Sequence, residues 1–183
     1  GAGFIGANLA DALMSDGQQV TVLDNLSRPG VERNLRWLAG RHGDRLRAIP
    51  ADLRDPTALK GAVAGAEAVF HLAAQTAVTT SLTAPVEDFE VNARGTLDLL
   101  EAVRATGRKL PVIFASTNKV YGALADLQVA ETDTRCGPTD NLIAAHGVDE
   151  TRPLDFCTPY GCSKGVADQY VLDYAKSYGI PAA

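Results

Sequence analysis

Apolar and polar positions alternate along the chain in blocks, and their spacing predicts strands and helices in turn. Short apolar runs are typical of buried strands, whereas apolar residues three or four positions apart indicate helices that bury one face. Strands are predicted at 19–23, 45–50, 66–72 and 110–115, with a further strand beginning near residue 180. A turn followed by a helix is predicted at 1–14. Further helices are predicted at 31–40, from residue 56, at 85–106 and at 158–178. This alternation predicts an α/β fold, a Rossmann-type doubly wound parallel sheet with helices on both faces.

Two predicted elements carry specific packing expectations, and one stretch fits no regular pattern. The residues expected to face the core are Leu35, Trp37 and Leu38 in the second helix and Val69, Phe70 and Leu72 in the fourth strand of the complete fold. Residues 121–156 are predicted to be a long, irregular, polar connection, and connections of this length are usually functional or disordered.

Composition and charge exclude some classes of function but do not identify one. The 183 residues suffice for one domain, 1–183, and 46% hydrophobic with 21% charged residues is an ordinary globular balance. A net charge of −5 argues against a nucleic-acid binder. No apolar run reaches membrane-spanning length, so neither nucleic acid nor membrane is expected as a partner. Cys136, Cys157 and Cys162 have no metal-ligand spacing, which indicates reduced thiols in a cytoplasmic protein.

The opening segment Gly1-Ala2-Gly3-Phe4-Ile5-Gly6 is a dinucleotide fingerprint. Gly1 allows a tight turn, Gly3 lets the backbone approach a pyrophosphate, and Gly6 lets the following helix pack on the sheet. The helix N-terminus then faces the pyrophosphate. A strand is expected before this motif but is not in the sequence. Together with the chain's last residues, this indicates a piece of a longer protein, lacking its first strand and a C-terminal substrate domain.

The residue after the next predicted strand bears on which dinucleotide binds. Asp24, with Asn25 beside it, follows the fingerprint by about 20 residues, the position that suits the adenosine ribose hydroxyls and repels a 2′-phosphate. NAD is therefore the predicted cofactor. Asp24 alternatively caps a turn, and Arg28 nearby leaves an opening for NADP.

Tyr160 and Lys164 lie four residues apart, on one face of the helix predicted at 158–178. A lysine ammonium one turn from a phenol favours the phenolate, which can take a proton from an alcohol. Such a pair on a helix is usually a solvated surface. Combined with a dinucleotide that accepts hydride, however, it supplies the second half of an alcohol oxidation.

Other candidates lie at the carboxyl ends of strands, where ligands of doubly wound sheets bind. Those assigned to the cofactor are Asp52, Leu53, Ala73, Ala74 and Gln75, and Asn92 in the helix predicted at 85–106 is assigned to it as well. Asp52 alternatively caps the next helix, and Asn92 and Gly95 in mid-helix are locally unfavourable, which often marks a functional or close-packed site. His71, inside a strand, fits a core histidine better than a base.

Hydroxyl and amide groups near these strand ends are the candidates for substrate binding. They are Thr79, Ser81, Thr117 and Asn118. For the segment 79–81, capping of the next helix is an equal alternative.

The sequence resembles the extended short-chain dehydrogenase/reductase family of NAD-dependent nucleotide-sugar epimerases and dehydratases. The pieces that carry the resemblance are Gly1, Gly3 and Gly6, Asp24, Asp52-Leu53, His71-Leu72-Ala73-Ala74, Asn92, Ser116-Thr117 with Val120-Tyr121-Gly122, and Tyr160 with Lys164. The resemblance implies Thr117, Tyr160 and Lys164 as catalytic residues and a transient keto-sugar. It further implies a nucleotide-sugar substrate and a homo-oligomer, dimer or tetramer, built on the helices 85–106 and 158–178.

A narrower resemblance is to the CDP-sugar 2-epimerases that interconvert CDP-paratose and CDP-tyvelose, which implies a role in O-antigen or lipopolysaccharide biosynthesis. Its pieces are Ala74-Gln75 with Thr79-Thr80-Ser81, residues 116–122, Glu131-Thr132-Asp133-Thr134-Arg135, Asp149-Glu150 with Leu154-Asp155-Phe156, and residues 159–170. The alternatives are a UDP-hexose 4-epimerase, a nucleotide-sugar 4,6-dehydratase and a non-catalytic NAD-binding protein. In the dehydratases an Asp-Glu pair follows the active-site threonine, whereas Asn118 and Lys119 stand there in this sequence.

Overall fold

The predicted strands pair in parallel, but they form two separate pairs. In this computed structural model, β1 (Val20–Asp24) pairs with β2 (Leu46–Pro50), and β3 (Val69–His71) pairs with β4 (Val112–Phe114). Residues 181–183 run parallel beside β4 through the bridge between Val112 and Ala182. The structure describes residues 1–131 and 133–183, so Thr132, part of a motif quoted above, lies outside the described residues.

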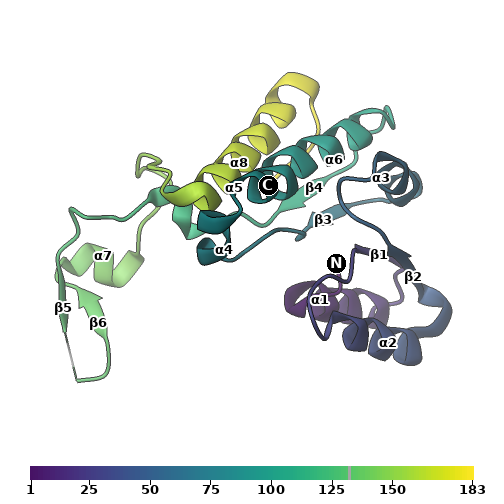
Figure 1. Cartoon of the computed structure of the whole chain (residues 1–183), viewed down its shortest axis with the longest axis horizontal. Coiled ribbons are helices and arrows are strands. Elements are labelled where there is room, and N and C mark those ends of the chain that lie inside the picture. Colours follow the sequence, from purple (N-terminus) through teal and green to yellow (C-terminus); the bar gives the residue numbers. More distant parts are fainter. Residues whose placement is uncertain (132) are drawn as a thin grey trace.

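Helices lie on both sides of these strands (Figure 1). They are α1 (Phe4–Ser15), α2 (Val31–His42), α3 (Pro56–Val63), α4 (Val78–Thr83), α5 (Pro85–Phe89), α6 (Gly95–Arg104), α7 (Asn141–His146) and α8 (Thr158–Tyr178). The bounds of α8 are those predicted, and the α/β architecture with parallel strands is confirmed. None of the helices in the described part of the chain combines the length and apolar character needed to cross a membrane.

A cavity of about 850 Å³ separates β1 from β3. Each of these strands is hydrogen-bonded to a neighbour on one side only, and apolar side chains from both line the cavity. Phe70 on β3 is 41% exposed there, so its predicted burial is wrong, because nothing covers this part of the strand pair. The strand expected before Gly1 stays a prediction.

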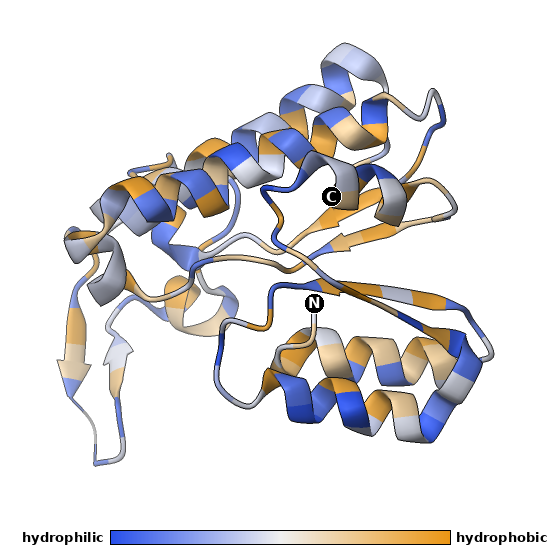
Figure 2. Cartoon of the chain, turned by 45° about the vertical axis from the view of Figure 1, so that its right-hand side comes forward, coloured by the Kyte–Doolittle hydropathy of each residue, from blue (hydrophilic) through white to orange (hydrophobic). Residues whose placement is uncertain are grey.

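The core is divided in the same way as the strands. One cluster, from α1, β1 and α2, consists of Ala2, Ala7, Ala10, Met14, Val22, Val31 and Leu38, and the other gathers residues of α3, α6, β4 and α8. Apolar segments mark both strand pairs and the inner sides of these helices (Figure 2). Trp37 is 46% exposed, contrary to prediction, because the inward positions of α2 are Val31 and Leu38.

The helix predicted at 85–106 is continuous but contains a π-helical turn at its centre. This turn, at Glu90–Arg94, joins α5 to α6 and contains the buried Asn92. A Cβ atom on Gly95 would lie 2.7 Å from Cδ2 of Leu53, so glycine allows this helix to approach the turn after β2. The local irregularity predicted at Asn92 and Gly95 is therefore confirmed as a close-packed site.

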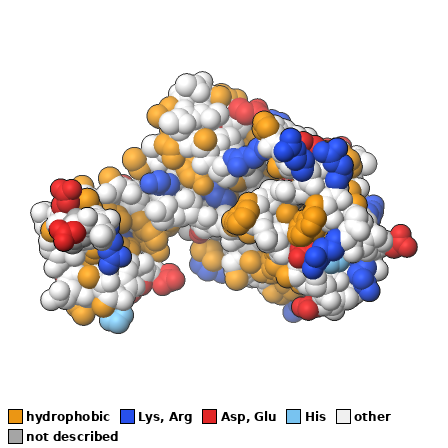
Figure 3. Space-filling view, turned by 90° about the horizontal axis from the view of Figure 1, so that it is seen from below, with side chains coloured by type: hydrophobic (Ala, Val, Ile, Leu, Met, Phe, Trp, Pro, Cys, Tyr) orange, Lys and Arg blue, Asp and Glu red, His pale blue; other side chains and the backbone are white. Residues whose placement is uncertain are grey.

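The long connection 121–156 is more regular than predicted. It carries α7 and an antiparallel hairpin of β5 (Val129–Glu131) and β6 (Cys136–Pro138), and we call this extension the arm. The arm stands away from the body as a separate lobe (Figure 3). At its base Arg152 pairs with Asp126, and the amide of Asp155 donates to the carbonyl of Val120 at 2.9 Å. Asp140 caps α7 by accepting two backbone N–H groups, which explains why a polar stretch forms a helix here.

Candidate active site

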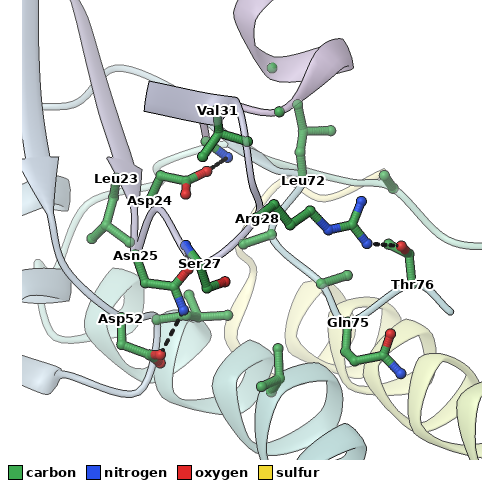
Figure 4. Close-up of a pocket in the computed structure, with 18 of the residues that line it drawn as sticks. Leu23, Asp24, Asn25, Ser27, Arg28, Val31, Asp52, Leu72, Gln75 and Thr76 are labelled. Carbon is green, nitrogen blue, oxygen red and sulfur yellow. Dashed lines mark hydrogen bonds and ion pairs between the residues drawn. The ribbon is translucent and has the colours of Figure 1, made fainter. Parts of the chain in front are cut away.

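A cavity of about 810 Å³ brings the opening glycine loop together with Tyr160 and Lys164. It lies at the carboxyl ends of β1, β2, β3 and β4, and Figure 4 shows the loops after β1, β2 and β3 around it. The sequence-predicted cofactor residues that line it are Gly1, Gly3, Phe4, Ile5, Gly6, Asp24, Asn25, Asp52, Leu53, Ala73, Ala74, Gln75, Tyr160 and Lys164. Its size is in the range of ordinary small-molecule sites.

The glycine loop leaves the start of α1 open toward this cavity. The N-cap residue Gly3 offers no side-chain hydrogen bond, so the first N–H groups of the helix are free to bind an anion. A Cβ atom on Gly6 would lie 1.9 Å from the carbonyl oxygen of Gly1, which requires glycine for the turn to close. Phe4 is 83% exposed at the rim, an apolar surface that a dinucleotide would cover.

Carboxylates at the ends of β1 and β2 form the polar wall of the cavity. Asp24 accepts the amide of Ala2 at 2.7 Å and the amide of Leu26 at 2.8 Å, so it holds both the glycine loop and its own turn. Asp52 accepts Nδ2 of Asn25 at 2.9 Å and Nε of Arg54 at 2.8 Å. The hydrogen bonds from Arg54 hold the pKa of Asp52 well below its usual range. Helix α3 is capped by Asp55, so the capping alternative for Asp52 is wrong.

Two arginines at this site, Arg28 and Arg54, make contacts that the sequence did not predict. Arg28 reaches across the cavity and donates to the hydroxyl of Thr76 (Figure 4). Arg54 spans from Asp52 to Glu87 on α5, with Nη1 at 2.9 Å from Oε2 of Glu87. Arg54, Thr76 and Glu87 also line the cavity. The position of Arg54 two residues after Asp52, in a tight turn, was the available sequence clue.

Tyr160 and Lys164 are both buried on the first turns of α8 and both face the cavity. Lys164 Nζ donates to the carbonyl oxygen of Ala115 at 2.6 Å and lies 3.9 Å from the centroid of the Phe114 ring. The carbonyl at the end of β4 and the ring beside it therefore fix where the ammonium sits. No sequence pattern could have identified Ala115, because its backbone makes this contact.

The charge on Lys164 is held in a largely dry environment. Burial lowers the pKa of Lys164 to about 8, and the negative charges of Asp168 and Asp88 act in the opposite direction. His71 lies nearby, with its ring 5.4 Å from that of Phe114 and its Nε2 2.9 Å from the hydroxyl of Thr96. Burial lowers the pKa of His71 to about 3, so the ring is neutral and the core-histidine interpretation is confirmed.

Asn92 lies directly behind the cavity rather than on its surface. Its Oδ1 accepts the amide of Gln75 at 2.9 Å, and its Nδ2 donates to the carbonyl of the same residue at 3.0 Å. It therefore clamps the loop after β3, which carries Ala73 and Ala74 into the cavity. A direct contact between Asn92 and a cofactor stays a prediction.

The predicted substrate residues are not among those that line the cavity. Thr117 begins a short 3₁₀ turn, accepting the amide of Lys119 at 3.3 Å, and its hydroxyl is 3.5 Å from Oδ1 of Asn118. Thr79 is exposed on α4, whereas Ser81 is buried and donates its hydroxyl to the carbonyl of Val78 at 2.7 Å. Their substrate roles, and the catalytic role of Thr117, stay predictions.

The amino-acid sequence is similar to those of a known protein family and of characterised enzymes. Residues 1–183 match the model of the NAD dependent epimerase/dehydratase family. The chain is 44% identical over 182 residues to the CDP-paratose 2-epimerase of Salmonella typhi, covering 98% of this chain and 52% of that protein. It is 34% identical to the dTDP-glucose 4,6-dehydratase of Mycolicibacterium smegmatis, covering 100% of this chain and 49% of that protein.

A solved structure agrees with these matches. The UDP-glucose 4-epimerase of Thermus thermophilus, in complex with NAD, superposes with a TM-score of 0.76 at 34% identity, covering 99% of this chain and 50% of that one. The chain spans about half the length of the curated relatives it matches.

Proposed function

The chain belongs to the NAD-dependent epimerase/dehydratase family, and on that premise we propose that it is the NAD-binding and proton-transferring part of a nucleotide-sugar epimerase. The substrate pair we propose is CDP-paratose and CDP-tyvelose, interconverted at C2 through a transient keto-sugar. The whole of 1–183 would serve as the dinucleotide-binding domain of a cytoplasmic enzyme.

One observation carries this proposal: a single cavity holds both the glycine loop and the Tyr160–Lys164 pair. The loop suits a pyrophosphate, and the pair suits an alcohol proton. A protein that only bound a dinucleotide would not need both Tyr160 and Lys164 in the same cavity. The juxtaposition therefore favours an enzyme over a non-catalytic NAD-binding protein.

The residues present fit NAD. The open N-terminus of α1 would hold the pyrophosphate, and Asp24 would bind the adenosine ribose hydroxyls, with Asn25 and Asp52 at the adenine end. Lys164 would hold the nicotinamide ribose. When bound, NAD⁺ supplies the acceptor that takes hydride from the carbinol carbon and gives it back.

The chain's own residues handle the proton. Tyr160 as phenolate would accept the proton of the sugar hydroxyl while hydride leaves the same carbon, producing a ketone. Lys164, fixed against the carbonyl of Ala115, would favour the phenolate by its positive charge. Thr117 would hydrogen-bond the reacting hydroxyl. The keto-sugar would then rotate within the site. Tyr160 would return the proton to the carbonyl oxygen as hydride returns to the opposite face of the carbon, so the net reaction is an isomerisation.

The segment after Thr117 separates epimerisation from dehydration. Loss of water from the sugar needs an additional acid and base, and the side chains that follow Thr117 are the amide of Asn118 and the amine of Lys119. Both are exposed, and neither is a carboxyl group. This supports an epimerase over a 4,6-dehydratase. A UDP-hexose 4-epimerase would use the same residues and is the remaining alternative.

We also propose a homo-oligomer formed through α5 and α8. Val86 and Phe89 on α5 are 74% and 50% exposed, and Tyr170 and Leu172 on α8 are 40% and 44% exposed. Apolar side chains this exposed on neighbouring helices suit a contact between copies. Sedimentation velocity should give a dimer or tetramer, and a monomer at micromolar concentration would contradict this.

The decisive experiment follows the hydrogen at C2. The protein that carries this chain is incubated with CDP-paratose in D₂O without added cofactor, and the product is read by NMR. CDP-tyvelose without deuterium at C2 supports internal hydride return. Deuterium at C2 would mean that the carbon itself is deprotonated, and the scheme would fail. Turnover of UDP-glucose but not of CDP-paratose would favour the 4-epimerase.

A matched variant tests the proton acceptor in the same assay. Tyr160→Phe keeps the ring and removes the phenolic oxygen, so turnover should fall by about 10² or more. Tyr178→Phe, at the exposed C-terminal end of α8, should leave turnover unchanged. Near-full turnover by Tyr160→Phe would show that another group takes the proton.

A further inference from the structure

A carboxylate with no assigned role is completely buried next to the active site. Asp88, on α5, has an exposed fraction of 0%. Its Oδ1 accepts Nε2 of Gln75 at 2.9 Å and Nδ2 of Asn92 at 3.3 Å, and its Oδ2 accepts the hydroxyl of Ser163. Within the described residues no lysine or arginine forms an ion pair with it. Aspartate is rarely buried completely without an ion pair, so the position of Asp88 calls for a physical reason.

The donors around Asp88 come from three parts of the site. Gln75 is on the loop after β3 that lines the cavity, and Asn92 is in the π-helical turn that clamps this loop. Ser163 is on α8 between the two proposed catalytic residues, and it also approaches the carbonyl of Tyr160 at 3.2 Å and receives Nδ2 of Asn92 at 3.1 Å. Asp88 is therefore the common acceptor that joins the cofactor loop to the first turn of α8.

Asp88 also acts on the site through its charge. The charged or titratable groups that face this region are Tyr160, Lys164 and Asp168 on α8 and His71 on β3, while α4 contributes none and Glu87 on α5 is paired with Arg54. Because His71 is neutral, Lys164 is the cation on which the charges of Asp88 and Asp168 act. Both carboxylates favour the protonated form of Lys164, against the effect of burial.

We propose that Asp88 is a positioning residue that ties the loop at Gln75 to the first two turns of α8, which carry Tyr160 and Lys164, and that its carboxylate is one of two, with Asp168, whose charge acts on Lys164. This inference rests on the proposed function, since it assigns Asp88 to the service of that site. It predicts two separable effects, one of charge and one of hydrogen bonding, and different substitutions remove each.

The charge is tested with Asp88→Asn, which has the same shape and can keep its hydrogen-bond partners. In the protein labelled with ¹³C-lysine, the NMR titration of Lys164 is followed directly and assigned with Lys164→Met. Within residues 1–183 the other lysines are Lys60, Lys109, Lys119 and Lys176. The midpoint for Lys164 should move to lower pH by about half a unit or more in Asp88→Asn. Asp173→Asn, an exposed carboxylate on the same helix, should leave it in place.

The link is tested with Ser163→Ala, which removes the bridge to α8 and keeps the carboxylate. The Lys164 midpoint should stay in place, while the Kd for NAD⁺, measured by calorimetry, should rise about threefold or more because the hydrogen bond that joins α8 to the Asp88 carboxylate is lost. This variant tests the link whether or not Asp88→Asn folds. An unchanged Lys164 midpoint in folded Asp88→Asn, or an unchanged Kd in Ser163→Ala, would overturn the proposal.

These readouts are independent of the nucleotide sugar. If the wild-type protein turns over none of the sugars tested and the Lys164 midpoint still moves in Asp88→Asn, the substrate assignment fails and the role of Asp88 stands. If the sugar is turned over and the midpoint does not move, the converse holds.

Discussion

Replacing Lys164 by methionine removes an ammonium group that the fold holds out of water. Burial lowers the pKa of Lys164 from 10.5 to about 8. Between these two values the unfolded chain binds a proton at this lysine and the folded protein does not, so the stability of the wild type rises with pH. The full penalty is present below pH 8 and has disappeared above about pH 10.5. A pKa difference of one unit corresponds to about 1.4 kcal/mol, which makes the full penalty about 3 kcal/mol.

The assay is urea unfolding of the wild type and Lys164→Met at pH 7, 8, 9 and 10. The wild type should gain about 2.5 kcal/mol relative to the variant between pH 7 and pH 10, because methionine has no proton to lose. The absolute difference at pH 7 is smaller than the penalty, since methionine also loses the bond to Ala115 and the contact with Phe114. Lys176→Met, exposed on the same helix, is the control and should show no pH-dependent difference. A difference between wild type and Lys164→Met that stays constant across this range would refute the reasoning.

Three further outcomes follow from the packing. Gly6→Ala should weaken NAD⁺ binding at least tenfold by calorimetry, because its Cβ atom would overlap the carbonyl oxygen of Gly1. Gly61→Ala, whose Cβ atom would meet no atom within 4 Å, should leave binding unchanged, and equal affinities of the two variants would contradict the loop geometry. Gly165→Ala should cost about 1–3 kcal/mol in urea unfolding, because its Cβ atom would lie 2.4 Å from the ring of Phe156; an unchanged midpoint would mean that the arm yields freely. The 183 residues expressed by themselves should melt without a cooperative transition and turn over no substrate, because β1 and β3 leave backbone groups unpaired at the cavity between them; a sharp calorimetric peak would argue otherwise.

Much of the fold could be predicted because local pattern and tertiary packing agree. The helix 158–178 carries a proline at its start and Gly179 after its end, in the left-handed conformation that ends helices, and its predicted bounds are those observed. The prediction failed at Trp37 and Phe70, two large apolar residues that remain exposed. Hydrophobicity alone does not say whether a neighbouring element exists to cover a side chain, and for Phe70 none does in this structure.

The site divides along a similar line. The glycine loop and Asp24 could be placed because the spacing of the glycines reflects a tight turn before a helix, and Asp24 holds that turn through the amide of Ala2. The roles of Ala115 and Asp88 could not, since one acts through its carbonyl and the other is an acidic residue in an amphipathic helix, where sequence predicts a solvated surface. Asn92 was found because it breaks a local rule, and the π-helical turn is the physical form of that irregularity.

The division of the core into two clusters has a consequence for optical measurements. The sequence contains one tryptophan, Trp37, and it lies on α2 within the half formed by α1, α2, β1 and β2. Its indole ring lies near the guanidinium of Arg41, 6.0 Å away, and the helices around Tyr160 and Lys164 contain no tryptophan. Far-ultraviolet circular dichroism, in contrast, is weighted toward the long helix α8. If the halves unfold separately, Trp37 fluorescence and circular dichroism will give different midpoints, and a melt followed by Trp37 alone would describe the half formed by α1, α2, β1 and β2 and miss the half that holds Tyr160.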